Sequence, residues 1–164
     1  MDERLFLYKV NPNYIKFLHE IDSKISVKYN GRPFVGVVTM ISRVKYVLPL
    51  TSQTTAERKA AGKNKRSSML TTFIKDSTGS EIANVLHNNM FPVTDEVIAK
   101  LEIDSETDTY ESNEIRFIRK NRDKIIAKAQ KVYELRISKP NDFLRKTCCD
   151  FLRLENFYKN FNAE

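Results

Sequence analysis

Residues 34–48 read FVGVVTMISRVKYVL, and this stretch decides the fold. Its first eight residues are almost all apolar and rich in β-branched side chains, which predicts a buried strand over 34–41. Ser42-Arg43 has the length of a tight turn, and the alternating residues 44–48 predict a second strand beside the first. Gly36 indicates a bulge or a close approach of another backbone. The centre of the chain is therefore predicted to be an antiparallel hairpin.

Further strands are predicted on both sides of this hairpin. The apolar run 4–10 precedes it, and residues 68–75 and 81–86 follow it around an Asp-Ser-Thr-Gly turn. Residues 90–93 form a short apolar piece whose proline keeps it away from the centre of a sheet. Together these runs predict a small antiparallel sheet, strongly twisted or partly closed into a barrel.

Helices are predicted around the sheet. Residues 12–21 carry apolar side chains on one helical face after an asparagine that can act as the cap. Residues 115–136 carry an apolar stripe with cations outside it, typical of a long amphipathic helix that Asn121 can break. Pro140 and Asn141 begin a last helix. The predicted fold class is α+β, with residues 1–164 as one domain.

The composition fits a globular protein of one domain. The chain has 164 residues, of which 41% are hydrophobic, and a formal net charge of +7. This charge is compatible with a polyanionic partner but does not require one. No apolar run is long enough to cross a membrane, so we expect a soluble, cytoplasmic protein without membrane contact.

Metal and cofactor chemistry find little support in the sequence. The two cysteines are adjacent, at Cys148 and Cys149, without the spacing of a zinc site, so we expect reduced thiols. The acids of 95–114 show no ligand spacing and are more typical of a solvated acidic segment. No nucleotide-binding loop is present. We therefore expect neither a metal nor a cofactor.

The end of the second hairpin strand carries the candidate chemistry. Thr51 and Ser52 follow its proline, and a basic segment comes next, with Arg58, Lys59, Lys63, Lys65 and Arg66. RNA cleavage by its own 2′-hydroxyl needs removal of that proton, stabilisation of charge on the phosphorane and a proton for the leaving 5′-oxygen. Hydroxyls can donate to the phosphate while cations stabilise the transition state. Turn chemistry and a solvated loop would give the same pattern.

The two histidines are weaker candidates. They lie in unrelated segments, which does not favour a catalytic pair. His19 is predicted at the surface of the first helix, and His87 lies near a strand end beside two asparagines. For both, a structural role is the more frequent one. From the residues alone, a non-catalytic RNA-binding module and a protein–protein adaptor remain alternatives to a nuclease.

An ordered set of short segments resembles one known family. The segments are Tyr14 to Leu18, Tyr29 with Arg32, Phe34 to Val38, Lys45-Tyr46, Leu48 to Ser52, Phe117 to Arg119, Asn121, and Asp123 to Ile125. In this order they resemble the ToxN/AbiQ family of endoribonuclease toxins from type III toxin–antitoxin systems, in which the antitoxin is an RNA.

The resemblance implies a fold and an activity. The fold would be a twisted antiparallel sheet with peripheral helices and a core similar to that of the Kid/MazF toxins. The activity would be metal-independent cleavage of single-stranded cellular or phage RNA that leaves a 2′,3′-cyclic phosphate. A small repeat RNA, cut from a precursor, would occupy the active-site groove as antitoxin, in a ring-like or paired oligomeric assembly. Phage defence by abortive infection in the bacterial cytoplasm would be the biological role.

The resemblance also assigns residues. Tyr29, Thr51 and Ser52 match active-site positions, Tyr14 matches a groove position, and Arg32 stands where the best-known member has a lysine. The family's catalytic lysine follows the Thr-Ser pair within a few residues. Here that stretch is Gln-Thr-Thr, so we expect a later cation to fold back.

We expect Lys59 to be this catalytic cation, with Lys63 or a different cation as alternatives. The remaining residues expected to contact RNA are cations and one histidine from four parts of the chain. They are Lys28, Arg58, Lys63, Lys65, Arg66, His87, Arg119 and Lys120.

Overall fold

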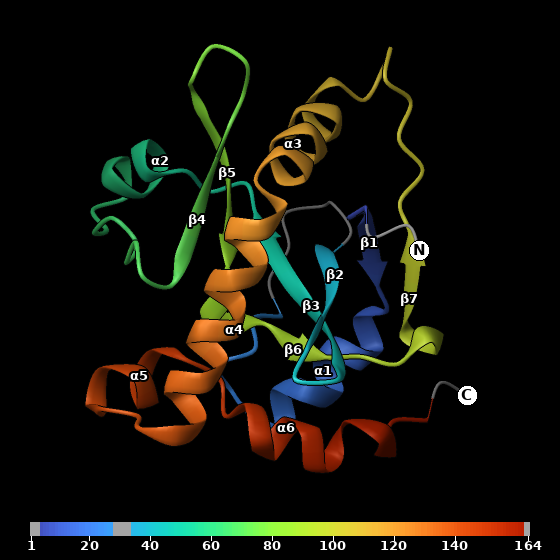
Figure 1. Cartoon of the computed structure of the whole chain (residues 1–164), viewed down its shortest axis with the longest axis vertical. Coiled ribbons are helices and arrows are strands. Elements are labelled where there is room, and N and C mark those ends of the chain that lie inside the picture. The colour runs from blue at the N-terminus through green and yellow to red at the C-terminus, as the bar shows by residue number, and fades with distance from the viewer. Residues whose placement is uncertain (1–3, 28–33, 163–164) are drawn as a thin grey trace.

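The computed structural model describes residues 4–27 and 34–162, and within them seven antiparallel strands form one sheet (Figure 1). The strands are β1 (Leu7–Val10), β2 (Val35–Ile41), β3 (Val44–Thr51), β4 (Thr71–Lys75), β5 (Glu81–Leu86), β6 (Phe91–Pro92) and β7 (Ile98–Lys100). Their order is β4-β5-β3-β2-β1-β7, and β6 pairs with β3. The predicted antiparallel sheet with peripheral helices is confirmed, as an open sheet rather than a closed barrel.

The hairpin of β2 and β3 is the centre of this sheet, as predicted. Ser42 (φ 49°) and Arg43 (φ 69°) both adopt the left-handed conformation that a two-residue turn between twisted strands requires. Gly36 lies opposite Pro49, and a Cβ on it would lie 2.7 Å from the carbonyl oxygen of Leu48. The predicted close backbone approach at Gly36 is therefore confirmed.

Strand β3 runs further than predicted, through its proline to Thr51. One edge of β3 pairs with β2, while its other edge is shared by two strands. Tyr46 and Val47 pair with β6, and Leu50 and Thr51 pair with β5. The C-terminal end of β3 is thus fixed by β5, and this pairing positions the hydroxyl residues that follow.

Six α-helices are described, together with short 3-10 turns at His87–Asn89, Asp95–Val97 and Tyr158–Asn160. They are α1 (Pro12–Ile21), α2 (Thr55–Ala60), α3 (Thr109–Lys120), α4 (Arg122–Ser138), α5 (Asp142–Thr147) and α6 (Phe151–Phe157). The predicted break at Asn121 separates α3 from α4. In Figure 1, α2 and the β4–β5 hairpin lie on one side of the molecule above α5, while α1 and α6 lie at its lower end.

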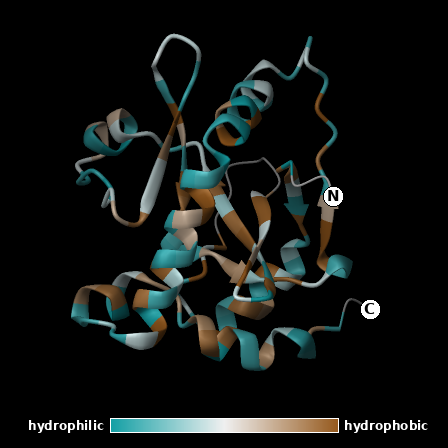
Figure 2. Ribbon diagram, in the orientation of Figure 1, coloured by the Kyte–Doolittle hydropathy of each residue, from teal (hydrophilic) through white to brown (hydrophobic). Residues whose placement is uncertain are grey.

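The core lies between the sheet and the helices. Hydrophobic residues concentrate on the central strands, whereas α2 and the loop after it are mostly hydrophilic (Figure 2). Tyr46 and Tyr133 are buried, and both hydroxyls donate to Oε2 of Glu155, over 2.5 and 2.8 Å. This shared carboxylate joins β3, α4 and α6. No helix of the described residues is both long and apolar enough to span a membrane.

The C-terminal helical region differs from the prediction of one helix. Cys148 and Cys149 interrupt it, and both are fully buried free thiols whose pKa burial raises. The Cys149 amide donates to the carbonyl of Asn88 over 2.9 Å. The chain therefore bends into the core between α5 and α6. As a consequence, the two helices pack against different parts of the molecule.

Candidate active site

A groove of about 930 Å³ lies beside the C-terminal end of β3. Its lining brings together residues that are far apart in the sequence. The hydroxyls of Thr51 and Ser52 belong to it, as do cations from the segment after α2. The predicted cations that line it are Arg58, Lys63, Lys65 and Arg66. The structure therefore joins the hydroxyl pair and most of the basic segment in one cavity.

The two hydroxyls differ in their surroundings. Thr51 is partly buried, and its Oγ1 accepts from the backbone N–H of Gln53 over 3.2 Å. This bond turns the chain away from the sheet just after β3. Ser52 is exposed, and its hydroxyl has no hydrogen-bond partner among residues 4–27 and 34–162. Ser52 is thus the hydroxyl available to a molecule in the groove.

Two arginines are held together beside this turn by Gln53. Arg66 donates to the Gln53 carbonyl oxygen over 2.8 Å, to its side-chain Oε1 over 3.1 Å and to Asn84 Oδ1 over 3.0 Å. Arg58 donates to the same Oε1 over 3.3 Å. Burial, followed by the positive charge of Arg58, lowers the pKa of Arg66, whereas Glu81 opposes this shift. Two guanidinium groups fixed this closely favour an anion between or beside them.

The short helix α2 explains why the basic segment returns to the groove. Thr54 caps it: the Thr54 Oγ1 accepts from the backbone N–H of Glu57 over 3.3 Å. Thr55 anchors the first turn to β5 through its N–H, which donates to Glu81 Oε2 over 2.7 Å. After the helix, the carbonyl of Asn64 accepts from Arg58 Nε over 2.8 Å, which closes the loop. The sequence analysis missed α2, although Thr54-x-x-Glu57 is a capping-box pattern.

The structure does not bring Lys59, the expected catalytic cation, to the groove. Lys59 lies on the exposed side of α2 and is not among the residues that line the groove. Because α2 is anchored through Thr54 and Thr55, the side that bears Lys59 turns outward while Arg58 turns inward. Arg58 and Arg66 do line the groove and are alternatives to Lys59 for the cation expected after Thr51 and Ser52.

Tyr14 and His87 are also corrected. Tyr14 is completely buried, packs against Phe91 and donates to the Pro92 carbonyl over 2.5 Å, so it belongs to the core and not to a groove. His87 is buried as well, and its Nε2 lies 2.8 Å from Thr72 Oγ1. Burial, with a contribution from Lys128, lowers the His87 pKa to about 3. A neutral, buried imidazole does not contact RNA phosphates.

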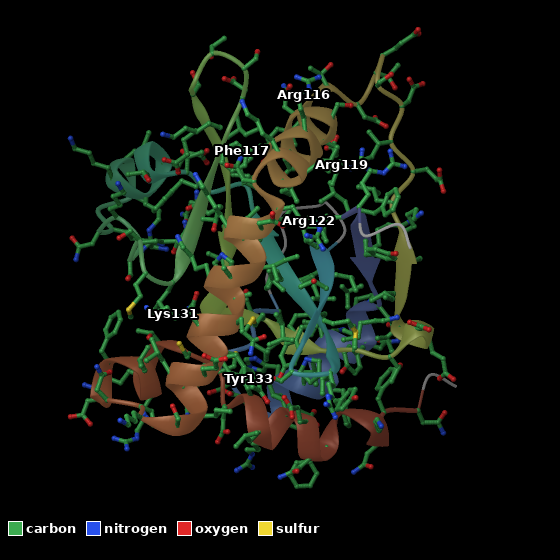
Figure 3. All side chains as sticks on the ribbon, in the orientation of Figure 1. Arg116, Phe117, Arg119, Arg122, Lys131 and Tyr133 are labelled. Carbon is green, nitrogen blue, oxygen red and sulfur yellow. The ribbon has the colours of Figure 1, made fainter. Side chains whose placement is uncertain are left out.

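Arg119 and Lys120 lie in a different place from the groove. With Arg4, Arg122 and Lys124 they line a separate hollow of about 730 Å³ at the α3–α4 junction. Figure 3 shows Arg119 and Arg122 at this junction. The Nε of Arg119 donates to the Leu5 carbonyl over 2.9 Å, and its guanidinium lies 5.0 Å from the Phe6 ring centre. Part of this basic cluster therefore holds the segment before β1 against α3.

Three predicted residues cannot be placed. Lys28, Tyr29 and Arg32 lie outside the described residues. Ser26 and Phe34, on either side of that segment, line the groove. Among the described residues no group of three or more His, Cys, Asp and Glu side chains could hold a metal ion.

Comparisons with known proteins identify the family of this chain. The family model described as "Toxin ToxN, type III toxin-antitoxin system" matches residues 6–159. The chain belongs to this family. It is 30% identical to the endoribonuclease ToxN of Bacillus thuringiensis subsp. kurstaki, over 90% of this chain and 79% of that protein. It is 27% identical to the endoribonuclease AbiQ of Lactococcus lactis subsp. lactis, over 92% of this chain and 86% of AbiQ.

Solved structures of the ToxN/AbiQ family share the fold. One, described as a type III toxin inhibited by a non-coding RNA pseudoknot, aligns with a TM-score of 0.83 at 24% identity, over 99% of this chain and 100% of that one. The structure of AbiQ, described as a lactococcal anti-phage endoribonuclease, also aligns with a TM-score of 0.83, at 22% identity over 98% and 99%. These likenesses confirm the expected fold.

Proposed function

We propose that this ToxN-family chain is the endoribonuclease toxin of a type III toxin–antitoxin system and that it cuts single-stranded RNA in the groove beside β3. The observation that carries the proposal is that the exposed hydroxyl of Ser52 lines one groove together with the paired guanidinium groups of Arg58 and Arg66. Hydrogen-bond donors and fixed cations are what a phosphoryl transition state requires.

The proposed reaction is transesterification within the RNA. The 2′-oxygen forms a bond to phosphorus and loses its proton, while the bond from phosphorus to the 5′-oxygen breaks and that oxygen gains a proton. The products are a 2′,3′-cyclic phosphate and a free 5′-hydroxyl. Because both the nucleophile and the leaving group belong to the RNA, this reaction needs no metal or cofactor.

Each groove residue then has a distinct task. Ser52 and Thr51 hydrogen-bond the non-bridging phosphate oxygens, and Arg58 and Arg66 stabilise the charge that builds up on them. We assign Tyr29 and Arg32 to positioning and proton transfer at the reacting phosphate, from their match to the family pattern. Lys28, Lys63 and Lys65 would hold the flanking RNA backbone.

The inhibitor in this proposal is a small folded RNA. Relatives come from systems in which a non-coding RNA inhibits the toxin. We propose that this chain cuts its own repeat RNA from a precursor and retains the product in the groove, within an oligomeric assembly. The hollow with Arg119 and Lys120 would contact phosphates of the folded antitoxin away from the cut site. We also propose a role in phage defence in the bacterial cytoplasm; the kinship with AbiQ, described as an anti-phage endoribonuclease, supports the phage defence.

The test uses purified full-length protein and a single-stranded RNA in buffer with EDTA. We expect cleavage at full rate and products with 2′,3′-cyclic phosphate ends, detected by their resistance to phosphatase until acid opens the ring. Loss of cleavage in EDTA would contradict the metal-independent reaction. RNA that is bound with a steep salt dependence but left uncut would support the alternative, a non-catalytic RNA-binding module.

A further inference from the structure

One wall of the groove, opposite in character to the basic segment, is formed by α5 and the turn at residues 87–89. Phe143 from α5 lines the groove together with Asn88, Asn89 and Thr147. Phe143 is 45% exposed. Of the exposed large apolar side chains in the described part of the chain, it is the one that lines this groove. An exposed aromatic ring in the lining of a groove offers a face on which a flat ring of a bound molecule can stack.

This wall is held rigidly by hydrogen bonds between α5 and the turn. The Asn88 Nδ2 donates to the Thr147 carbonyl over 2.9 Å, and the Asn88 carbonyl accepts from the Cys149 N–H over 2.9 Å. Within α5, the Thr147 hydroxyl donates to the Phe143 carbonyl over 2.7 Å. The backbone of α5, which carries Phe143, is therefore held against Asn88 and the turn, as a recognition site requires.

The side chains of Asn88 and Asn89 leave one hydrogen-bond acceptor and one hydrogen-bond donor available to a ligand. The Nδ2 of Asn88 is occupied by Thr147, which leaves its Oδ1 without a partner among the described residues. The Oδ1 of Asn89 accepts from Asn88 Nδ2 over 3.4 Å and from Cys149 Sγ over 3.9 Å, which leaves its Nδ2 without one in the same part of the chain. Each nucleobase presents a neighbouring donor and acceptor on its edge, so the pair has the chemistry to read one.

We propose that this wall is a nucleobase subsite in which Phe143 stacks on an unpaired base next to the cleaved phosphate while Asn88 and Asn89 hydrogen-bond its edge. The subsite would set the nucleotide preference of cleavage. It rests on the proposed function for the identity of the strand as RNA. The division of labour is physical: cations and hydroxyls bind the backbone, which is the same for every sequence, whereas the aromatic ring and amides contact the base.

Stacking is tested without cleavage by fluorescence of 2-aminopurine in a short single-stranded RNA whose 2′-hydroxyls are replaced by fluorine. Wild-type protein should quench the probe at one position, and Phe143→Leu should lose the quenching and bind roughly ten-fold more weakly. Phe143→Trp should restore both. The matched control is Phe157→Leu, because Phe157 is 44% exposed on α6 but does not line the groove. Unchanged quenching and affinity in Phe143→Leu would overturn the proposal.

Base reading is tested by sequencing the cleaved ends of a random RNA pool. Phe143→Leu and Asn89→Ala should both flatten the preference at the same nucleotide position. Asn89→Ala removes the open donor at the cost of two long hydrogen bonds, so the fold should persist. If wild-type protein cuts but neither variant changes the preference, the subsite is wrong and the proposed function stands. If wild-type protein does not cut, the proposed function fails, and the fluorescence experiment still decides whether Phe143 stacks a base.

Discussion

Two basic regions of this molecule, the groove beside β3 and the hollow at the α3–α4 junction, carry similar positive charge but differ in their other groups. The groove beside β3 combines four cations with a free hydroxyl and an open aromatic ring. The hollow at the α3–α4 junction is lined by Arg4, Arg119, Lys120, Arg122 and Lys124, with Asn121 and one acid, Asp123. Its Arg119 donates to the carbonyl of Leu5, before β1, whereas the Ser52 hydroxyl has no hydrogen-bond partner within the described residues. Positive charge therefore marks two surfaces that can meet RNA, and we propose the groove, which adds hydroxyls to its cations, as the one where a phosphate is cleaved.

The largest expected effect is that of Ser52→Ala on cleavage. Removing a donor to the phosphorane should reduce the cleavage rate by about 100-fold or more, by analogy with the loss of one oxyanion donor. Antitoxin affinity should change only a few-fold, since the cations remain. The measurement is single-turnover cleavage of a labelled RNA. Ser68→Ala is the control, because Ser68 is exposed and outside the groove lining; equal rates for the two variants would remove Ser52 from the reaction.

Arginine substitutions in the two regions should separate catalysis from stability. Arg66→Ala should lower cleavage by about 10- to 100-fold and the free energy of unfolding by about 1–3 kcal/mol, because Gln53 and Asn84 lose their partner. Arg66→Lys should not restore cleavage, since the lysine ammonium lacks the planar guanidinium group with its several N–H donors. Arg119→Ala should also lower stability, through the lost bond to Leu5, yet leave cleavage of a short RNA unchanged. A cleavage defect in Arg119→Ala as large as that in Arg66→Ala would break the comparison.

The sequence predicted the central architecture well because local signals decide it. The hairpin of β2 and β3 follows from alternation and a two-residue turn, and the break at Asn121 follows from the pattern of the helix. Elements that depend on tertiary contacts rather than on the local sequence were missed or misplaced. Strand β7 has only three residues and exists because β1 offers a free edge, and Cys148-Cys149 divide the last helix because the core receives both thiols.

The site was predicted less completely for the same reason. The pair Thr51-Ser52 lies at a strand end that sequence can locate. Which cation returns to this pair depends on α2, whose capping threonine is hard to distinguish within a polar segment. Phe143 looked like one more apolar residue of the last helix, and only the separation of α5 from α6 turns it toward the groove. Tyr14 shows the opposite error, a residue assigned by resemblance that packing places in the core.

His87 provides a pH test of the buried side of the turn at residues 87–89. Its pKa falls from 6.5 to about 3, chiefly through burial and then through Lys128. The folded state keeps it neutral while the unfolded state binds a proton below pH 6.5, so its contribution to stability is complete above that pH. Stability should fall by about 1.4 kcal/mol per pH unit as the pH drops from 6.5 toward 3.

The measurement for His87 is urea unfolding at pH 7 and pH 5. Wild-type protein should lose about 2 kcal/mol more than His87→Gln over this interval. An equal loss in both proteins would show that His87 is not buried in its neutral form. A groove histidine, by contrast, would give the cleavage rate an inflection near pH 6.5 that His87→Gln abolishes.

The smallest expected effect distinguishes the two lysine pairs. Lys63→Ala with Lys65→Ala should weaken binding of both a short RNA and a folded antitoxin several-fold and reduce the salt dependence of each. Lys120→Ala with Lys124→Ala should weaken only the antitoxin, because the hollow lies away from the cut site. Binding measured at two salt concentrations decides this. If the second pair affects the short RNA as strongly as the first, the two regions form one binding surface.

The most direct test of the groove as the cleavage site is photo-crosslinking of an uncleavable RNA that carries 4-thiouridine next to a 2′-fluoro cleavage position. Mass spectrometry of the crosslinked peptides should place the RNA on residues 51–67 and on the wall at 141–149. Crosslinks confined to residues 119–124, at the α3–α4 hollow, would contradict the assignment of the active site to the end of β3.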